Sequence, residues 1–249
     1  MSSIKIGLCG ASGRMGQAIE RLIINQPQKF ELVGKVSSDN DDAILSAMCS
    51  AAEIIMDFSA PEAIKPLVKA MTKCSAKLIV GTTGLGAEHF ARLQELSKQN
   101  AVLYAPNTSI GANLVANLAA KSAKILQEYD VEIIEAHHKH KKDAPSGTAI
   151  MIGKKIAEAN NVDFDKKAIF DRANKGLRKT GEIGFSAIRG GGIFGENEVM
   201  FAGENELITI GCRALSRDAF AEGALYSALW ISRQKPGMYS MDDVLQLDT

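Results

Sequence analysis

The chain has 249 residues, 46% of them hydrophobic and 23% charged, so it can bury one large core or two smaller ones. Its 29 basic and 29 acidic side chains cancel, which argues against a general attraction to nucleic acid or to an anionic membrane. It has no apolar run of the ~20 residues that span a bilayer and no signal-peptide pattern at its start, so we expect a cytoplasmic protein.

The first half of the chain alternates short apolar runs with longer amphipathic segments. Five runs are predicted to be buried strands: residues 4–9, 30–36, 54–58, 78–80 and 102–104. Three segments carry apolar residues at helical spacing: 15–24, 62–73 and 87–98. This order predicts an α/β fold with a Rossmann-like, doubly wound parallel sheet. The weakly patterned residues 39–49 predict an abbreviated or irregular connection.

After Asn107 the pattern changes. Helices are predicted over residues 110–126 and 148–160, and strands over 131–135, 185–189, 198–202 and 207–212. These elements predict a second, α+β domain with an open mixed sheet, whose edges and faces commonly pair. A last amphipathic helix over 218–232 returns the chain to the first domain. We expect one domain from 1–108, completed by 218–249, and another from 109–217.

A glycine-rich turn lies between the first predicted strand and helix. It reads Gly10-Ala11-Ser12-Gly13-Arg14-Met15-Gly16. Glycines permit a tight turn and close approach of the backbone, and the start of a helix attracts a pyrophosphate. The spacing is one residue longer than the common G-x-G-x-x-G pattern. The turn predicts dinucleotide binding, and the alternative is a merely structural turn.

The choice between NADH and NADPH depends on the end of the second strand. Asp39 is the nearest carboxylate there, and it would hold a ribose 2′-hydroxyl and repel a 2′-phosphate, which favours NADH. Lys35 and two serines could still accommodate the phosphate. Asp39 could equally be a solvated residue or a helix cap.

Further polar groups follow the later strands of the predicted sheet, where doubly wound sheets bind ligands. One such group is Asp57-Phe58-Ser59. The others are Gly81-Thr82-Thr83-Gly84 and Ala105-Pro106-Asn107-Thr108, and each of the three is predicted to form a wall of the nicotinamide pocket. Each segment alone could equally be turn and capping chemistry.

Three of the four histidines fall within residues 135–149, which read E-A-H-H-K-H-K-K-D-A-P-S-G-T-A. The lysines concentrate positive charge, and Ser146-Gly147-Thr148 opens a helix whose amides can bind a carboxylate. A small dicarboxylate would find donors on both sides. Histidine, with an ordinary pKa of about 6.5, suits proton donation near neutral pH, and neighbouring lysines lower that pKa.

Metal binding is one alternative for this basic loop, because adjacent histidines can bind zinc. The interleaved lysines repel a cation, and the four cysteines lie far apart without C-x-x-C spacing, so we expect no metal. A simply solvated loop is the other alternative. Pro145 and Gly147, which restrict the backbone between a strand and a helix, argue against it.

Together these motifs resemble the 4-hydroxy-tetrahydrodipicolinate reductase family, also called dihydrodipicolinate reductase. The most specific part is residues 135–149, close to the family's E-A-H-H-x-x-K-x-D-A-P-S-G-T-A signature. The resemblance covers nearly the whole chain. It implies reduction of a cyclic dicarboxylate by NADH or NADPH in lysine biosynthesis through diaminopimelate. It also implies a first domain that binds dinucleotide, a second that binds substrate, and a homotetramer built through the second domain's sheet.

The resemblance also implies residue roles. His137 would donate a proton to the substrate ring, with Lys141 as the second catalytic group. The substrate carboxylates would be bound by His138, Gly147 and Thr148. The cofactor would be bound by Gly10 to Met15, Gly81 to Thr83 and Ala105 to Thr108, near Arg217 and Phe220. Two positions depart from the family: Thr108, often Phe in relatives, and Ser38-Asp39, where relatives can have Glu-Arg.

Two other functions remain open at this stage. One is another two-domain NAD(P)-dependent dehydrogenase, such as a homoserine or sugar dehydrogenase, against which the 135–149 motif argues. The other is a sensor that binds dinucleotide without catalysis and uses the basic loop only as an anion site.

Overall fold

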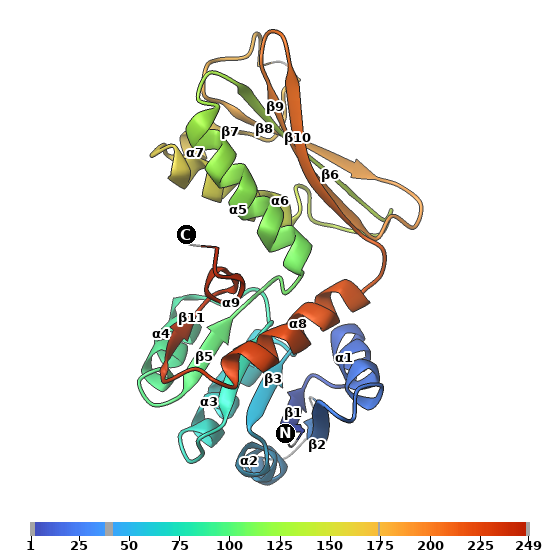
Figure 1. The fold of residues 1–249 in the computed structure, drawn as a ribbon, viewed down its shortest axis with the longest axis vertical. Helices are drawn as coiled ribbons and strands as arrows, with labels where there is room; N and C mark the ends of the chain where they lie inside the picture. The colour runs from blue at the N-terminus through green and yellow to red at the C-terminus, as the bar shows by residue number, and fades with distance from the viewer. Residues whose placement is uncertain (1–2, 38–41, 174, 248–249) are drawn as a thin grey trace. The chain divides into compact units, whose positions relative to one another are not determined.

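The computed structural model describes residues 3–37, 42–173 and 175–247, and the chain forms two compact units (Figure 1). Unit 1 comprises Met1–Ser109 and Arg217–Thr249, and unit 2 comprises Ile110–Ser216. Both crossings between the units lie within one residue of the expected domain limits.

Unit 1 is built on a sheet of six strands, all parallel, in the order β11-β5-β4-β3-β1-β2. Its strands are β1 (Ile4–Cys9), β2 (Phe30–Val36), β3 (Ile54–Asp57), β4 (Lys77–Val80), β5 (Ala101–Tyr104) and β11 (Gly237–Tyr239). Its helices are α1 (Arg14–Ile24), α2 (Asp42–Ala51), the 3-10 helix η1 (Pro61–Ala63), α3 (Ile64–Met71), α4 (Ala87–Leu96), α8 (Asp218–Ile231) and α9 (Met241–Leu245).

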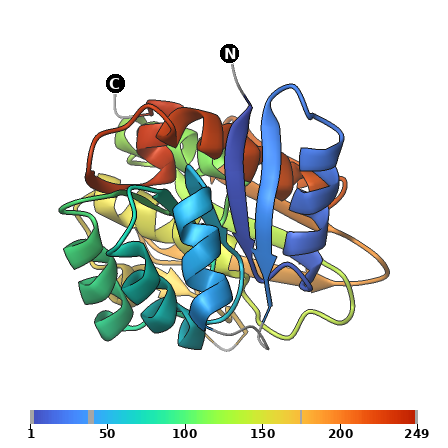
Figure 2. The same cartoon turned by 90° about the horizontal axis from the view of Figure 1, so that it is seen from below.

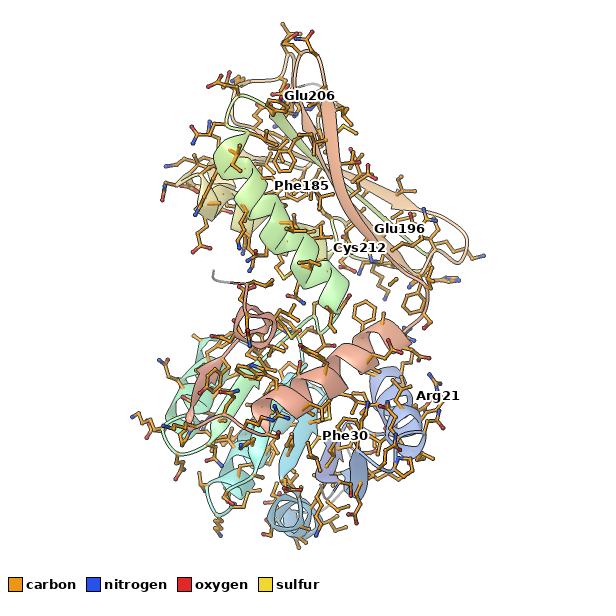
Figure 3. All side chains as sticks on the ribbon, in the orientation of Figure 1. Arg21, Phe30, Phe185, Glu196, Glu206 and Cys212 are labelled. Atoms are coloured by element: carbon orange, nitrogen blue, oxygen red, sulfur yellow. The ribbon has the colours of Figure 1, made fainter. Side chains whose placement is uncertain are left out.

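Helices cover both faces of this sheet. Side chains of α1, α8 and α9 pack on one face in a single hydrophobic cluster, and Arg21 of α1 (Figure 3) pairs with Asp218 of α8. A second cluster joins α2, α3 and α4 to the other face, and Figure 2 shows these three helices side by side. The sheet is therefore doubly wound, as the sequence predicted.

The segment before β3 differs from the expectation. Residues 42–51 form a regular ten-residue helix, α2, instead of an irregular connection. Only Met48 and Cys49 are buried in it, so too few apolar positions face the core to reveal a helical period. Met48 packs where Gly7 and Gly34 have no side chain, since a Cβ on either would lie within 2.8 Å of Met48 Cγ.

Unit 2 has a mixed sheet of five strands in the order β10-β9-β6-β8-β7. Strands β6, β8 and β7 pair in parallel, whereas β9 pairs antiparallel with both β6 and β10. Its elements are α5 (Ile110–Ile125), β6 (Asp130–His137), α6 (Gly147–Ala159), α7 (Phe164–Lys167), β7 (Ala168–Ile169), β8 (Ile183–Arg189), β9 (Gly195–Ala202) and β10 (Leu207–Ala214). The predicted fold class is confirmed. Apart from α2, the elements the sequence did not predict are short: α7, β7, β11 and α9.

One face of this second sheet packs against α5 and α6, with Phe201, Val199 and Ile133 fully buried. The residues around Ile188 line a groove of about 390 Å³ on the sheet, to which Glu196 and Cys212 (Figure 3) belong. Among the described residues, no helix has the length and apolar character needed to cross a membrane.

Candidate active site

The glycine turn of unit 1 is held by close backbone contacts. Gly10 has φ +76°, its N–H donates to the Val36 carbonyl at 2.9 Å, and its own carbonyl accepts from the Gly13 N–H at 3.0 Å. A Cβ on Gly16 would lie 2.3 Å from that carbonyl oxygen. Helix α1 begins at Arg14, and its N-cap Gly13 supplies no side-chain acceptor. The first amides of α1 are thus arranged as in a phosphate-binding turn.

A cavity of about 510 Å³ lies beside this turn. It is lined by the turn and by the segments after β2 and β3: Cys9, Gly10, Ser12, Gly13, Val36, Ser37, Asp42, Leu45, Phe58, Ser59, Ala60, Glu62, Ala63, Pro66 and Leu67. A glycine turn, an uncapped helix start and an adjoining cavity fit a dinucleotide. This described lining contains two carboxylates, Asp42 and Glu62, and neither lysine nor arginine.

A buried carboxylate connects the ends of β3 and β4. Asp57 is fully buried and accepts hydrogen bonds from the hydroxyls of Ser59 and Thr82, the latter at 2.6 Å. The Ser59 N–H donates to Thr82 Oγ1 at 3.0 Å. Burial raises the pKa of Asp57, and the hydroxyl hydrogen bonds oppose that rise without cancelling it. The cluster fixes two of the predicted cofactor segments to each other.

Other predicted cofactor residues have structural contacts of their own. Met15 packs against the core, and the Ala11 N–H donates to the Val36 carbonyl at 3.2 Å. Gly81 lies against the Phe58 ring, where a Cβ would meet a ring carbon at 2.1 Å. Thr83 is exposed.

The segment after β5 is tied to α8. Thr108 is buried and donates to the Phe220 carbonyl at 2.7 Å, so threonine has a structural partner at this position of departure from the family. Asn107 Oδ1 accepts from the Ser109 N–H at 2.9 Å, Ala105 is buried and Pro106 is exposed. Neither residues 105–108 nor residues 81–83 are among the described residues that line the cavity beside the glycine turn. Asp39 lies outside the described residues.

In unit 2, the basic loop begins with a histidine held by a buried carboxylate. His137 is the last residue of β6, and its Nδ1 lies 2.6 Å from Glu135 Oε2. Glu135, only 1% exposed, also accepts from the Ser146 N–H at 3.0 Å and from both terminal nitrogens of Arg189, at 2.7 and 2.6 Å. Residues 135 and 137 point to the same face because side chains alternate along a strand.

The charges in this cluster shift two pKa values downward. Burial lowers the pKa of His137, and the positive charges of Lys141 and Arg189 add to that effect, which Glu135 only partly offsets. Burial alone would raise the pKa of Glu135. The hydrogen bonds and charges of Arg189 and His137 outweigh burial and hold that pKa below its usual range. Glu135 is therefore ionised near neutral pH.

The predicted substrate-binding residues lie on the same loop. Lys141 Nζ pairs with Asp143 Oδ1 at 2.9 Å, and His138 Nδ1 is buried without a hydrogen-bond partner among the described residues. Gly147 is the first residue of α6, and a Cβ there would meet nothing within 4 Å. The Ser146 hydroxyl caps α6 by accepting from the Ala149 N–H at 3.2 Å. Thr148 follows Gly147 in the first turn of α6.

The structure adds two residues for which the sequence predicted no role, Glu135 and Arg189. The i, i+2 spacing of Glu135 and His137 on a strand was a usable signal. No local pattern pointed to Arg189, which reaches His137 only because β8 pairs in parallel with β6. Across the described part of the chain, no group of three or more histidine, cysteine, aspartate or glutamate side chains could hold a metal ion.

A doubly wound sheet with a dinucleotide turn, followed by a mixed-sheet unit with a histidine-lysine loop, defines a two-domain, dinucleotide-dependent oxidoreductase. The chain matches "Dihydrodipicolinate reductase, N-terminus" over residues 4–108 and "Dihydrodipicolinate reductase, C-terminus" over residues 111–245. It belongs to the dihydrodipicolinate reductase family, and the predicted resemblance is confirmed.

Relatives of similar length are named 4-hydroxy-tetrahydrodipicolinate reductase. The chain is 42% identical over 240 residues to a 4-hydroxy-tetrahydrodipicolinate reductase of Rickettsia bellii, covering 96% of this chain and 94% of that one. It is 39% identical to the reductase of Polynucleobacter necessarius, covering 98% and 99%. A dipicolinate-bound dihydrodipicolinate reductase from Paenisporosarcina shares the fold, with a TM-score of 0.74 at 23% identity over 97% and 99%.

Membership makes the chain an oxidoreductase that works with a nicotinamide cofactor. A DAP dehydrogenase of C. glutamicum, solved with DAP, shares the fold more distantly, with a TM-score of 0.58 at 14% identity over 100% of each chain. The alternative of a homoserine or sugar dehydrogenase is not favoured, because the full-length relatives are reductases of the one family.

Proposed function

We propose that the chain is a 4-hydroxy-tetrahydrodipicolinate reductase. It reduces (2S,4S)-4-hydroxy-2,3,4,5-tetrahydrodipicolinate to (S)-2,3,4,5-tetrahydrodipicolinate with NADH or NADPH, in lysine biosynthesis through the diaminopimelate pathway. The observation that carries the proposal is the histidine of the signature motif, held by buried Glu135 beside Lys141 and the start of α6. The full-length relatives support the same reaction.

The loop of unit 2 supplies the groups that such a substrate requires. Lys141 offers positive charge, His138 offers a hydrogen-bonding ring, and the amides of Gly147 and Thr148 at the start of α6 would bind a carboxylate of the substrate. A doubly negative ring is thereby attracted to the loop. His137 donates a proton to the ring, and Lys141 offsets the negative charge that develops there. The bound nicotinamide supplies the hydride.

The lining of the unit 1 cavity supports NADH over NADPH. Asp42 and Glu62 place carboxylates there, which would repel a 2′-phosphate. Lys35, the cation nearest the end of β2, has its Nζ 2.7 Å from Glu20 Oε1. Asp39 stays the predicted partner of the ribose 2′-hydroxyl. Titrating NADH and NADPH separately should give tighter binding of NADH, and equal or tighter binding of NADPH would contradict this preference.

We also propose a homotetramer in the cytoplasm. The groove on the unit 2 sheet, which apolar and charged side chains line together, and the half-exposed Ile188 and Leu207 offer a surface for a second copy. The four cysteines are all unbridged, which is usual in a reducing compartment. Light scattering of the purified protein should give about four times the 26.7 kDa chain mass. A monomer would refute the assembly.

The reaction is tested by mixing the protein with NADH or NADPH and the condensation product of pyruvate and aspartate semialdehyde. Cofactor oxidation should require that product, and an absence of oxidation with both cofactors would refute the proposal. The matched variant is His137→Gln, expected to lose on the order of 10² or more in turnover with little change in cofactor affinity. Faster turnover of an uncharged alcohol would favour a different dehydrogenase.

A further inference from the structure

Glu135 carries more ionic and hydrogen-bonding contacts than stability alone explains. It is 1% exposed and accepts from an imidazole, a backbone amide and both terminal nitrogens of one guanidinium. Replacing a buried ion pair by apolar side chains is often neutral or stabilising, so a gain in stability is not a sufficient reason for this cluster. Its contact with His137 suggests that reason.

The guanidinium of Arg189 is held by two backbone carbonyls as well as by Glu135. Its Nη1 donates to the Ile188 carbonyl at 2.7 Å, and its Nη2 donates to the Asp143 carbonyl at 2.6 Å. It lies opposite His137 in the register of β6 and β8. The planar guanidinium grips both oxygens of Glu135 at once, so the carboxylate cannot rotate without breaking two charged hydrogen bonds.

The fixed position of the Glu135 carboxylate determines which nitrogen of the His137 imidazole carries a hydrogen. An ionised carboxylate only accepts hydrogen bonds, so His137 Nδ1 must carry the hydrogen that it shares with Glu135. The second proton of the imidazolium then resides on Nε2. Gly195 leaves space beside that nitrogen, since even a methyl group there would come within 3.3 Å of Nε2.

We propose that Glu135, clamped by Arg189, is the positioning residue of His137 and makes Nε2 the nitrogen that delivers the proton. This inference rests on the proposed reductase function. In the step, the Nε2–H bond breaks and the proton bonds to the substrate ring, to which a bound reduced nicotinamide would supply the hydride. Over the whole reaction the ring also loses its 4-hydroxyl group as water. His137 is left neutral with its hydrogen on Nδ1, and the nicotinamide that supplied the hydride would be left oxidised. Glu135 stays ionised throughout and touches no reacting atom.

The test compares Glu135→Gln with Glu132→Gln. Glu132 lies on the same strand and also pairs with two arginines, Arg172 and Arg178, but it contacts no histidine in the described structure. Glu135→Gln should lower kcat on the order of 10²-fold while the KM values stay within about threefold. As the pH is raised, this variant should lose activity at a lower pH than the wild type does, because the negative charge that raises the pKa of His137 is gone. Glu132→Gln should change neither kcat nor this pH dependence.

A second measurement uses the ligand-free protein. Nitrogen–proton NMR of the histidine side chains should show the neutral His137 ring protonated at Nδ1 in the wild type. Protonation at Nε2, or a Glu135→Gln enzyme indistinguishable from Glu132→Gln, would overturn the proposal. A wild-type protein that oxidises neither cofactor with the cyclic substrate would refute the reductase function, while the NMR tautomer would still decide the positioning role. The wild-type spectrum also decides it if Glu135→Gln fails to fold.

Discussion

Two strand-loop-helix segments with opposite construction carry the predicted functional residues. The turn of residues 10–16 in unit 1 follows β1, uses close backbone contacts and leaves α1 without a side-chain cap. The loop of residues 137–147 in unit 2 follows β6, is built on buried charge, and has α6 capped by Ser146. Under the proposed function, the same placement would serve a phosphate in one unit and proton chemistry in the other.

One buried carboxylate in each unit, Asp57 in unit 1 and Glu135 in unit 2, shows why the partners of a buried charge matter. Asp57 has only hydroxyl and amide partners, so burial dominates and its pKa rises. Glu135 has a guanidinium and an imidazole, so its pKa falls although its side chain is also shielded from solvent and burial alone would raise that pKa. Burial therefore does not determine the charge of a carboxylate until its partners are known.

The largest effect should follow from removing the cation of unit 2. Arg189→Met leaves Glu135 buried without its main partner, and we expect unfolding free energy to fall by about 4 kcal/mol in urea denaturation. Adding Glu135→Gln to this variant should restore part of the loss, because the unpaired charge disappears. In unit 1 the comparable change, Thr82→Val, removes the hydroxyl's hydrogen bonds to Asp57 and from the Ser59 N–H but no ion pair, and should cost about 2 kcal/mol. Equal losses at Arg189 and Thr82 would break the comparison.

The next largest difference in stability between the two segments should come from replacing one glycine in each with alanine. Gly16→Ala puts a Cβ 2.3 Å from a backbone oxygen, and we expect a loss of about 3 kcal/mol measured by thermal or urea unfolding. Gly147→Ala meets open space and should leave stability unchanged or slightly higher. It should nevertheless raise the KM of the dicarboxylate about tenfold, a change of roughly 1.4 kcal/mol, if this helix start binds a carboxylate. An unchanged KM would remove Gly147 from the substrate site.

The sequence predicted the features that are local in the chain. The glycine turn and the 135–149 motif are contiguous, and strands β1 and β2 match their apolar runs residue for residue. Helix α2 was missed because just two of its residues, Met48 and Cys49, are buried. Arg189 was missed because it is 54 residues from Glu135, and only the parallel pairing of β6 with β8 brings them together.

The contributions of Glu135 and Asp57 to the free energy of unfolding should change in opposite directions with pH. Glu135 has a lowered pKa in the folded state, so its stabilisation is present above its unfolded value of about 4.5 and is lost as pH falls through the folded pKa. The cost of Glu135→Gln should therefore grow as pH rises through that window. Asp57 has a raised pKa, so its stabilisation is present below about 3.8 and is lost as pH rises through the folded pKa.

The cost of Asp57→Asn should accordingly shrink as pH rises. Urea unfolding of the wild type and both variants between about pH 3 and pH 6 measures each cost as a difference, with expected changes of about 1 kcal/mol. If the stability costs of the two substitutions changed with pH in the same direction, the partners of Glu135 would not reverse the effect of its burial on its pKa.

The smallest effect should come from crowding the nitrogen that faces away from Glu135. In Gly195→Ala the new Cβ would lie 3.3 Å from His137 Nε2, so the imidazole must shift by a few tenths of an ångström. Misplacing a catalytic group by about 1 Å can cost 10²-fold, so a displacement this small should lower kcat about fivefold with little loss of stability. Gly192→Ala, where a Cβ meets nothing within 4 Å, is the matched control in the preceding turn and should leave kcat unchanged. If both variants retained wild-type kcat, the space beside Nε2 would not matter for proton delivery, and the glycine at 195 would serve the start of β9 alone.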